Sequence, residues 1–211
     1  MAKINIQNNI NLINYTTIKV GGNAKYFSEP ADIPELENIL KWARNNNINC
    51  DIIGAGSNLL ISENICKSLF ICTKKLKAIN LNPDTGILEA ESGVMLPTIS
   101  NLLAKNSCKG GEWSIGIPGT VGGAIFMNAG YGDFSISKHL ISVKVIDIQT
   151  LNIFNISRKD LTFRYRFSPF QKNKLIILSA KFYFEPGGDK HLITKVTKAT
   201  LKKKTDSQPY H

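Results

Sequence analysis

The middle of this 211-residue chain carries a glycine-rich stretch, Gly116-Ile117-Pro118-Gly119-Thr120-Val121-Gly122-Gly123-Ala124, which Asn128-Ala129-Gly130 follows closely. Seven of the 16 glycines lie between residues 110 and 130, interleaved with isoleucine, valine and alanine. This pattern is typical of backbone packed against something large and flat, and not of a flexible linker. Thr120 is predicted to cap a short helix whose N-terminus faces a diphosphate. The alternative is close packing of a helix on a sheet without a ligand.

A second glycine loop, Gly54-Ala55-Gly56-Ser57-Asn58, directly follows the apolar segment Cys50–Ile53, which is predicted to be a buried strand. Glycines leave room for backbone N–H groups to approach an anion, and successive N–H groups form a concave nest. The loop lacks the Gly-x-Gly-x-x-Gly and the distant acidic residue of a dinucleotide-binding fingerprint. It therefore predicts a phosphate site or, alternatively, a tight turn between strands.

The third stretch, Phe163-Arg164-Tyr165-Arg166-Phe167-Ser168-Pro169-Phe170, alternates aromatic and cationic residues with the period of a strand. Arginine offers a planar fork of donors that fits a carboxylate or a phosphate. A basic and aromatic strip also suits single-stranded nucleic acid, and an edge strand with solvated arginines would give the same pattern.

Composition indicates a folded chain, with 43% apolar residues and a net charge of +10. Half of that charge lies in residues 190–211, where Leu192, Val196 and Ala199 predict the buried stripe of a surface helix. The lysines on its other face are expected to be solvated or to contact an anion. The four cysteines lack metal-site spacing, so no metal is expected, and no signal peptide or membrane span is predicted. These features predict a cytoplasmic protein without membrane insertion.

The pattern of elements predicts an α+β protein with two tightly packed lobes, residues 1–74 and 75–204. The first lobe combines short strands with a helix that starts at Asp32, where Glu35 completes a capping box. The second contains strands near residues 78–81, 87–91, 142–148, 152–156 and 175–184, and a helix near residues 96–103.

In this order the stretches resemble the UDP-N-acetylenolpyruvoylglucosamine reductase family, flavoenzymes of peptidoglycan precursor synthesis. The resemblance covers nearly the whole chain. It begins at Asn14-Tyr15-Thr16-Thr17-Ile18-Lys19-Val20-Gly21-Gly22 and continues through residues 54–60, 116–130 and 165–168.

The resemblance implies a two-lobed FAD-binding fold of the vanillyl-alcohol-oxidase (PCMH-type) class. It also implies NADPH as co-substrate, which reduces the flavin, and a UDP-sugar enolpyruvate as the substrate reduced to UDP-N-acetylmuramate. Nucleic acid is not among the implied partners, and the oligomeric state is left open. Arg166 matches the catalytic arginine and Tyr165 its neighbour in the substrate site. The residues matching the cofactor loops are Gly54, Ala55, Gly56, Ser57, Asn58, Gly116, Ile117, Pro118, Gly119, Thr120, Gly122, Gly123, Ala124 and Asn128.

Two departures from the family pattern stand out. Tyr131-Gly132 follows Asn128-Ala129-Gly130 one position early, so no role is assigned to Tyr131. Residues 205–211 resemble the start of the connection to a substrate domain that supplies a serine proton donor and a late glutamate. Neither residue is found in these 211, so the alternatives are a reductase and a flavin-binding remnant without reductase activity. A third interpretation is an RNA-binding protein, but it does not explain the glycine pattern.

Overall fold

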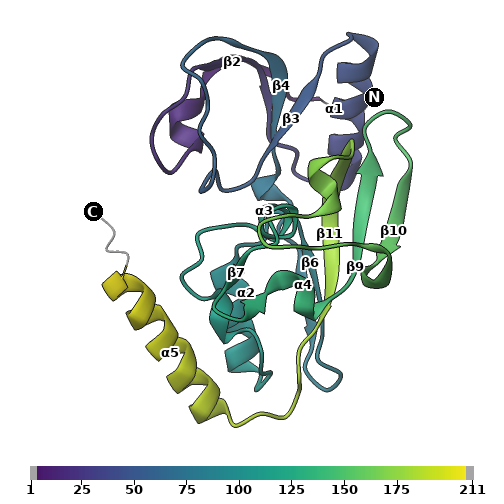
Figure 1. Ribbon diagram of the computed structural model, residues 1–211. Coiled ribbons are helices and arrows are strands. Elements are labelled where there is room, and N and C mark those ends of the chain that lie inside the picture. Colours follow the sequence, from purple (N-terminus) through teal and green to yellow (C-terminus); the bar gives the residue numbers. More distant parts are fainter. Residues whose placement is uncertain (1–3, 208–211) are drawn as a thin grey trace.

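The computed structural model describes residues 4–207 and contains two main sheets and five α-helices in that range (Figure 1). The segment Gln208-Pro209-Tyr210-His211, which resembles a connection to a further domain, lies outside the described residues. The strands are β1 Gln7–Asn11, β2 Asn23–Ser28, β3 Cys50–Ile53, β4 Cys66–Cys72, β5 Ile79–Asn82, β6 Ile87–Glu91, β7 Gly130–Tyr131, β8 Phe134–Ser135, β9 Leu140–Asp147, β10 Ile153–Ser157 and β11 Leu175–Tyr183. The helices are α1 Ile33–Asn45, α2 Leu96–Lys105, α3 Val121–Phe126, α4 Ile136–His139 and α5 Lys190–Ser207.

The first sheet has the strand order β1-β2-β4-β3, with β4 parallel to both of its neighbours and β1 antiparallel to β2. Helix α1 connects β2 to β3 and begins where the sequence predicts. The Asp32 side chain accepts a hydrogen bond from the Glu35 N–H at 2.8 Å, and the Glu35 carboxylate accepts one from the Ala31 N–H at 2.7 Å. The second contact of the predicted capping box is therefore made one residue earlier than usual.

The second sheet has the order β10-β9-β11-β6-β5, and all its neighbouring strands are antiparallel. Both of its faces are covered. Successive residues of a strand point to opposite sides, so neighbouring residues pack in different cores. Val145 and Ile177 pack in the same core as α2 and α3, whereas Ile146 and Ile176 pack in the core formed by α1. This explains the unbroken apolar run Leu175-Ile176-Ile177-Leu178 in β11.

The two lobes therefore share a hydrophobic core. Leu36, Ile39 and Leu40 of α1 pack in one buried cluster with Ile146 and Leu178 of the second sheet. A division of the chain near residues 74 and 75 separates the two sheets in sequence, and it stays a prediction.

The prediction that Cys50–Ile53 is a buried strand is only half right. The strand forms as β3, but it lies at the edge of the first sheet, with β4 as its one neighbour. Asp51 and Ile52 are exposed and only Ile53 is fully buried, because an edge strand has a neighbouring strand on one side only. The buried Ile53 directly precedes the loop of residues 54–58.

The predicted buried stripe of the C-terminal helix is wrong. Helix α5 exposes Leu192 and Val196 and instead buries Ile193, Thr197 and Lys204. It packs on α2 and on the short 3-10 helix Glu112–Ser114. The Lys204 Nζ donates hydrogen bonds of 2.5 Å to the carbonyl oxygens of both Trp113 and Ile115. These acceptors allow the lysine to be buried on this face of the helix.

We expect this buried amine to give the stability of the fold a pH dependence. Burial lowers the pKa of Lys204 to about 8, whereas a lysine in an unfolded chain titrates near about 10.4. The unfolded chain holds the proton more tightly, so the free energy of unfolding should rise as pH increases through this window and fall as pH decreases through about 8.

Thermal denaturation of the wild-type chain and of Lys204→Met at several pH values between about 7.5 and 10 checks this prediction. The wild-type melting temperature should rise relative to that of the variant as the pH increases. Parallel curves for the two chains would contradict it.

Candidate flavin site

The structure brings the two glycine-rich loops together, although they are far apart in the sequence. A Cβ atom added to Gly54 would lie less than 3.0 Å from the Thr120 Oγ1, and one added to Gly119 would have the Ser57 Oγ, at 3.8 Å, as its nearest neighbour. The loop after β3 therefore lies against the start of α3, near the middle of Figure 1. We call these two neighbouring loops, residues 54–58 and 116–123, the glycine cradle.

The first backbone N–H groups of helix α3 donate hydrogen bonds within the protein. The Val121 N–H donates to the Val94 carbonyl and the Gly122 N–H to the Ser92 carbonyl, both at 2.8 Å. The Gly123 N–H donates to the Thr120 Oγ1 at 3.4 Å, so Thr120 is the N-cap that the sequence predicts. These three N–H groups are not free to bind a diphosphate, as a helix N-terminus otherwise would.

The loop after β3 has free donors instead. Within residues 4–207, the backbone N–H groups of residues 55–58 have no hydrogen-bond acceptor. Gly56 has φ +69°, and its position leaves no room for a Cβ because the Tyr15 carbonyl oxygen lies there. The carbonyl of Gly56 accepts a hydrogen bond from the Thr17 N–H at 3.1 Å, which holds the loop in place. A fixed loop with several free N–H groups suits a phosphate group.

Close packing alone accounts for some of the glycines but not for all. A Cβ on Gly122 would lie 3.0 Å from the Ser92 Cβ, so this glycine is needed for the approach of α3 to the chain after β6. A Cβ on Gly119 would make only the ordinary contact with Ser57, and one on Gly123 would lie 3.6 Å from the Thr120 Oγ1. Nothing inside the described chain requires glycine at residue 119. The open space beside it fits the close approach of a bound group.

The strand predicted for the arginine-rich stretch is wrong. Residues 164–167 form a tight turn, closed by hydrogen bonds of 3.1 Å in both directions between the backbones of Arg164 and Phe167. Arg166 has φ +52°, in the left-handed region, which ends any strand. Tyr165 is 90% exposed, and the Arg166 guanidinium lies 5.5 Å from the centre of its ring. The two predicted substrate-site residues therefore lie together at the tip of a turn.

This arginine turn is attached to the C-terminal end of α3. The Ser168 hydroxyl donates to the Phe126 carbonyl at 2.7 Å, and the Asn128 side-chain amide donates to the Arg164 carbonyl at 2.8 Å. Asn128, predicted as a cofactor residue, is thus brought to the turn, and its contact with a cofactor stays a prediction. The six residues of α3 span about 9 Å. The helix links the glycine cradle at one end to Arg166 at the other.

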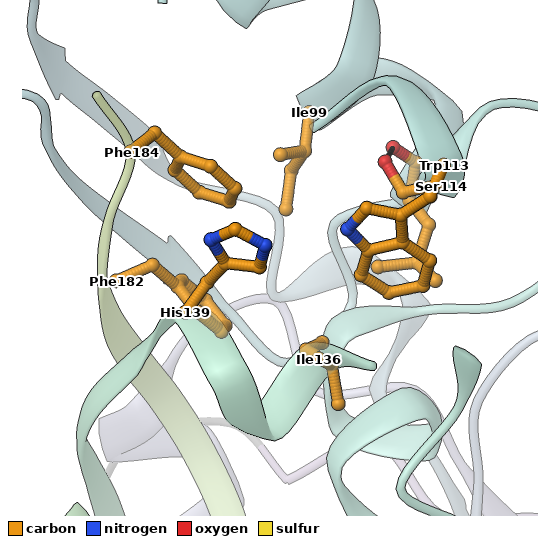
Figure 2. A pocket seen from close by; sticks show the side chains of 8 residues that line it. Ile99, Trp113, Ser114, Ile136, His139, Phe182 and Phe184 are labelled. Carbon is orange, nitrogen blue, oxygen red and sulfur yellow. Dashed lines mark hydrogen bonds between the residues drawn. The ribbon is translucent and has the colours of Figure 1, made fainter. Parts of the chain in front are cut away.

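A cavity between α2, α4 and the end of β11 is too small for a cofactor. Figure 2 shows His139 stacked on Phe184, with one ring nitrogen directed toward Trp113. The cavity volume is about 10 Å³, and burial lowers the pKa of His139. Space for about one water molecule is far less than the several hundred Å³ of a typical ligand site.

Two further features bear on the class of protein. Among residues 4–207, no three His, Cys, Asp or Glu side chains gather as a metal site would require. In the same range no helix is both long and apolar enough to span a bilayer.

Comparison with known proteins defines the class. Residues 24–151 match the FAD binding domain family, so the chain contains a flavin-binding domain. Alkyldihydroxyacetonephosphate synthase has a similar fold, with a TM-score of 0.59 over 80% of this chain at 15% identity. These matches confirm the predicted α+β fold of the vanillyl-alcohol-oxidase type.

Nearer relatives share one function. The chain is 56% identical to UDP-N-acetylenolpyruvoylglucosamine reductase of Prochlorococcus marinus subsp. pastoris, covering 100% of this chain and 71% of that protein. The same enzyme of Synechococcus sp. strain RCC307 is 41% identical, over 99% of this chain and 68% of its own length. The crystal structure of this reductase from Thermus caldophilus gives a TM-score of 0.80 at 25% identity, over 99% of this chain and 72% of that one. The chain belongs to the UDP-N-acetylenolpyruvoylglucosamine reductase family.

The glycine cradle predicts different outcomes for two glycine substitutions. Gly119→Val places its side chain in open space, so we expect the fold to survive and flavin affinity to fall at least about tenfold. Gly122→Val drives its side chain into Ser92, so we expect a lower melting temperature together with any loss of flavin.

Flavin absorbance per chain and the melting temperature, measured for both variants, check this prediction. Normal flavin content in folded Gly119→Val would exclude a role for that side of the cradle.

Proposed function

We propose that the chain binds FAD noncovalently in the glycine cradle. The free N–H groups of residues 55–58 would bind the diphosphate, and the open face at Gly119 would let the cofactor lie close to the backbone. The loop 54–58 offers neither histidine nor cysteine for a covalent bond to the flavin. When bound, FAD supplies hydride transfer from NADPH to a substrate double bond.

We propose further that the reaction is the NADPH-dependent reduction of UDP-N-acetylglucosamine enolpyruvate to UDP-N-acetylmuramate, in the cytoplasm. One observation carries this proposal: α3 holds the cradle at its start and the Arg166 turn at its end. Hydride addition to an enol ether conjugated with a carboxylate builds negative charge on the substrate. The planar guanidinium of Arg166 would stabilise that charge, and the exposed ring of Tyr165 would contact the substrate beside it.

The second candidate is a flavin-binding protein without reductase activity. The 211 residues span 71% of the length of the Prochlorococcus protein. The reaction also needs a proton at the carbon next to the one that accepts hydride, which the family resemblance assigns to a serine not found among these residues. RNA binding is less well supported, since the arginines lie on a turn and form no basic strand.

Noncovalent binding predicts that the colour leaves the protein on denaturation. After precipitation with acid or heat, the yellow absorbance should appear in the supernatant with the spectrum of free FAD. Colour that stays with the precipitated chain would show a covalent bond and contradict the proposal.

Catalysis is tested by comparing residues 1–211 with a fusion to the remaining C-terminal part of the Prochlorococcus relative. A positioned acid contributes about 10²–10⁴-fold, and lost substrate contacts cost at least as much, so we expect the 211-residue polypeptide to be slower by at least about 10³-fold. In the fusion, Arg166→Lys should lower turnover by about 10²-fold, since lysine keeps the charge but loses the planar fork.

Steady-state kinetics of the three proteins check both statements. Near-normal turnover by the 211-residue polypeptide would show that the proton donor lies within it. Unchanged turnover of Arg166→Lys would remove Arg166 from the mechanism.

A further inference from the structure

Arg166 is held in a backbone conformation that its own sequence does not favour. Its φ of +52° lies in the left-handed region, where a side chain crowds the following carbonyl. Both Arg166 and Tyr165 are exposed, so packing of their side chains does not fix this conformation. Other groups must hold the turn.

Two side-chain amides from outside residues 164–167 donate hydrogen bonds to the backbone of the turn. The Asn128 amide donates to the Arg164 carbonyl at 2.8 Å, on one side of the tip. The Gln171 amide donates to the Arg166 carbonyl at 3.1 Å, on the other side. The carbonyls that flank Tyr165 are therefore both held by side chains.

Gln171 connects the turn directly to α3. Its Nε2 also donates to the Phe126 carbonyl at 2.9 Å, at the last residue of the helix. A primary amide has two N–H donors, and here each one has a carbonyl acceptor on a different element. Gln171 follows Phe170, which is 2% exposed and packs in the core of the second lobe. The buried phenylalanine keeps the backbone of Gln171 in place.

Asn128 provides the matching attachment. It lies two residues after the end of α3 and has φ +44°. Its Oδ1 is buried and has no hydrogen-bond partner within residues 4–207. Burial of an unpaired acceptor is unfavourable, so the favourable contact of this amide group is the one made by its other end, the donor to the Arg164 carbonyl.

We propose that Gln171 and Asn128 are positioning residues that hold the Arg166 turn in register with α3, and thereby set where the guanidinium lies relative to the glycine cradle. This proposal rests on the proposed function only for its effect on turnover. Its structural part, the restraint of the turn, is independent of any reaction.

Hydrogen exchange tests the restraint in the 211-residue chain. Gln171→Met keeps the length of the side chain but removes both donors. We expect exchange of the two cross-turn N–H groups, those of Arg164 and Phe167, to accelerate at least about tenfold, with a melting temperature close to that of the wild type. Gln149→Met, on the exposed turn between β9 and β10, is the matched control and should leave this exchange unchanged.

Turnover tests the consequence in the fusion protein described above. Gln171→Met should lower kcat by about tenfold with normal flavin content, whereas Gln171→Lys, which retains hydrogen-bond donors, should recover most of the loss. Asn128→Asp, which removes the amide donor, should act in the same direction as Gln171→Met.

The outcomes separate this proposal from the proposed function. Unchanged exchange and unchanged turnover in Gln171→Met would overturn it. If kcat falls only in proportion to the flavin content, the proposal would also be overturned. The same holds if the fall in kcat comes with a lower melting temperature, because either result describes a residue that only stabilises the fold. If Arg166→Lys is fully active, the proposed role of Arg166 fails, yet the exchange data still decide whether the amides hold the turn.

Discussion

The close approach of Gly54 to Thr120 is the contact on which the rest of the site depends. A side chain at residue 54 would overlap the hydroxyl that caps α3, so only glycine lets the end of β3 reach the start of that helix. This contact with the buried Thr120 side chain joins the two lobes at the site, as the shared cluster of α1 with the second sheet joins them elsewhere in the core. Without it, residues 55–58 would not lie beside the start of α3.

Helix α3 carries this arrangement from the cradle to the arginine turn. It is too short to be stable alone, and its position is fixed by its surroundings. Val121, Ala124 and Ile125 are buried, two of its first N–H groups bond to the chain that follows β6, and its last carbonyl accepts from Ser168 and Gln171. A helix held at both ends would give the Arg166 turn a defined distance from a cofactor bound at the cradle.

Local signals in the sequence were enough for the starts of α1 and α3 and for the family. Asp32 and Glu35 predicted the start of α1, and Thr120 predicted the cap of α3, because capping depends on neighbours three residues apart. The ordered motifs predicted the flavin fold, which the comparisons confirm. Contacts decided by distant parts of the chain were not predictable in this way. Lys204 is buried with the carbonyls of Trp113 and Ile115 as its acceptors, distant groups that the helix sequence does not reveal, and Leu192 is exposed.

The conformation of the arginine turn was likewise not predictable from the local sequence. Alternation of aromatic and basic residues fits a strand, and no residue type near Arg166 indicates the left-handed conformation that this residue has. The amides that impose it come from Asn128 and Gln171, on two different segments. Roles in binding could be proposed from the motifs, but the geometry that connects them needed the fold.

The most direct test of the central claim is a crystal structure of the flavin-loaded protein, with distances measured from the backbone nitrogens of residues 55–58 to the diphosphate oxygens. The account predicts at least two such distances of about 2.7–3.2 Å, with the cofactor passing over Gly119. A diphosphate bound elsewhere, with these N–H groups facing only solvent, would contradict it.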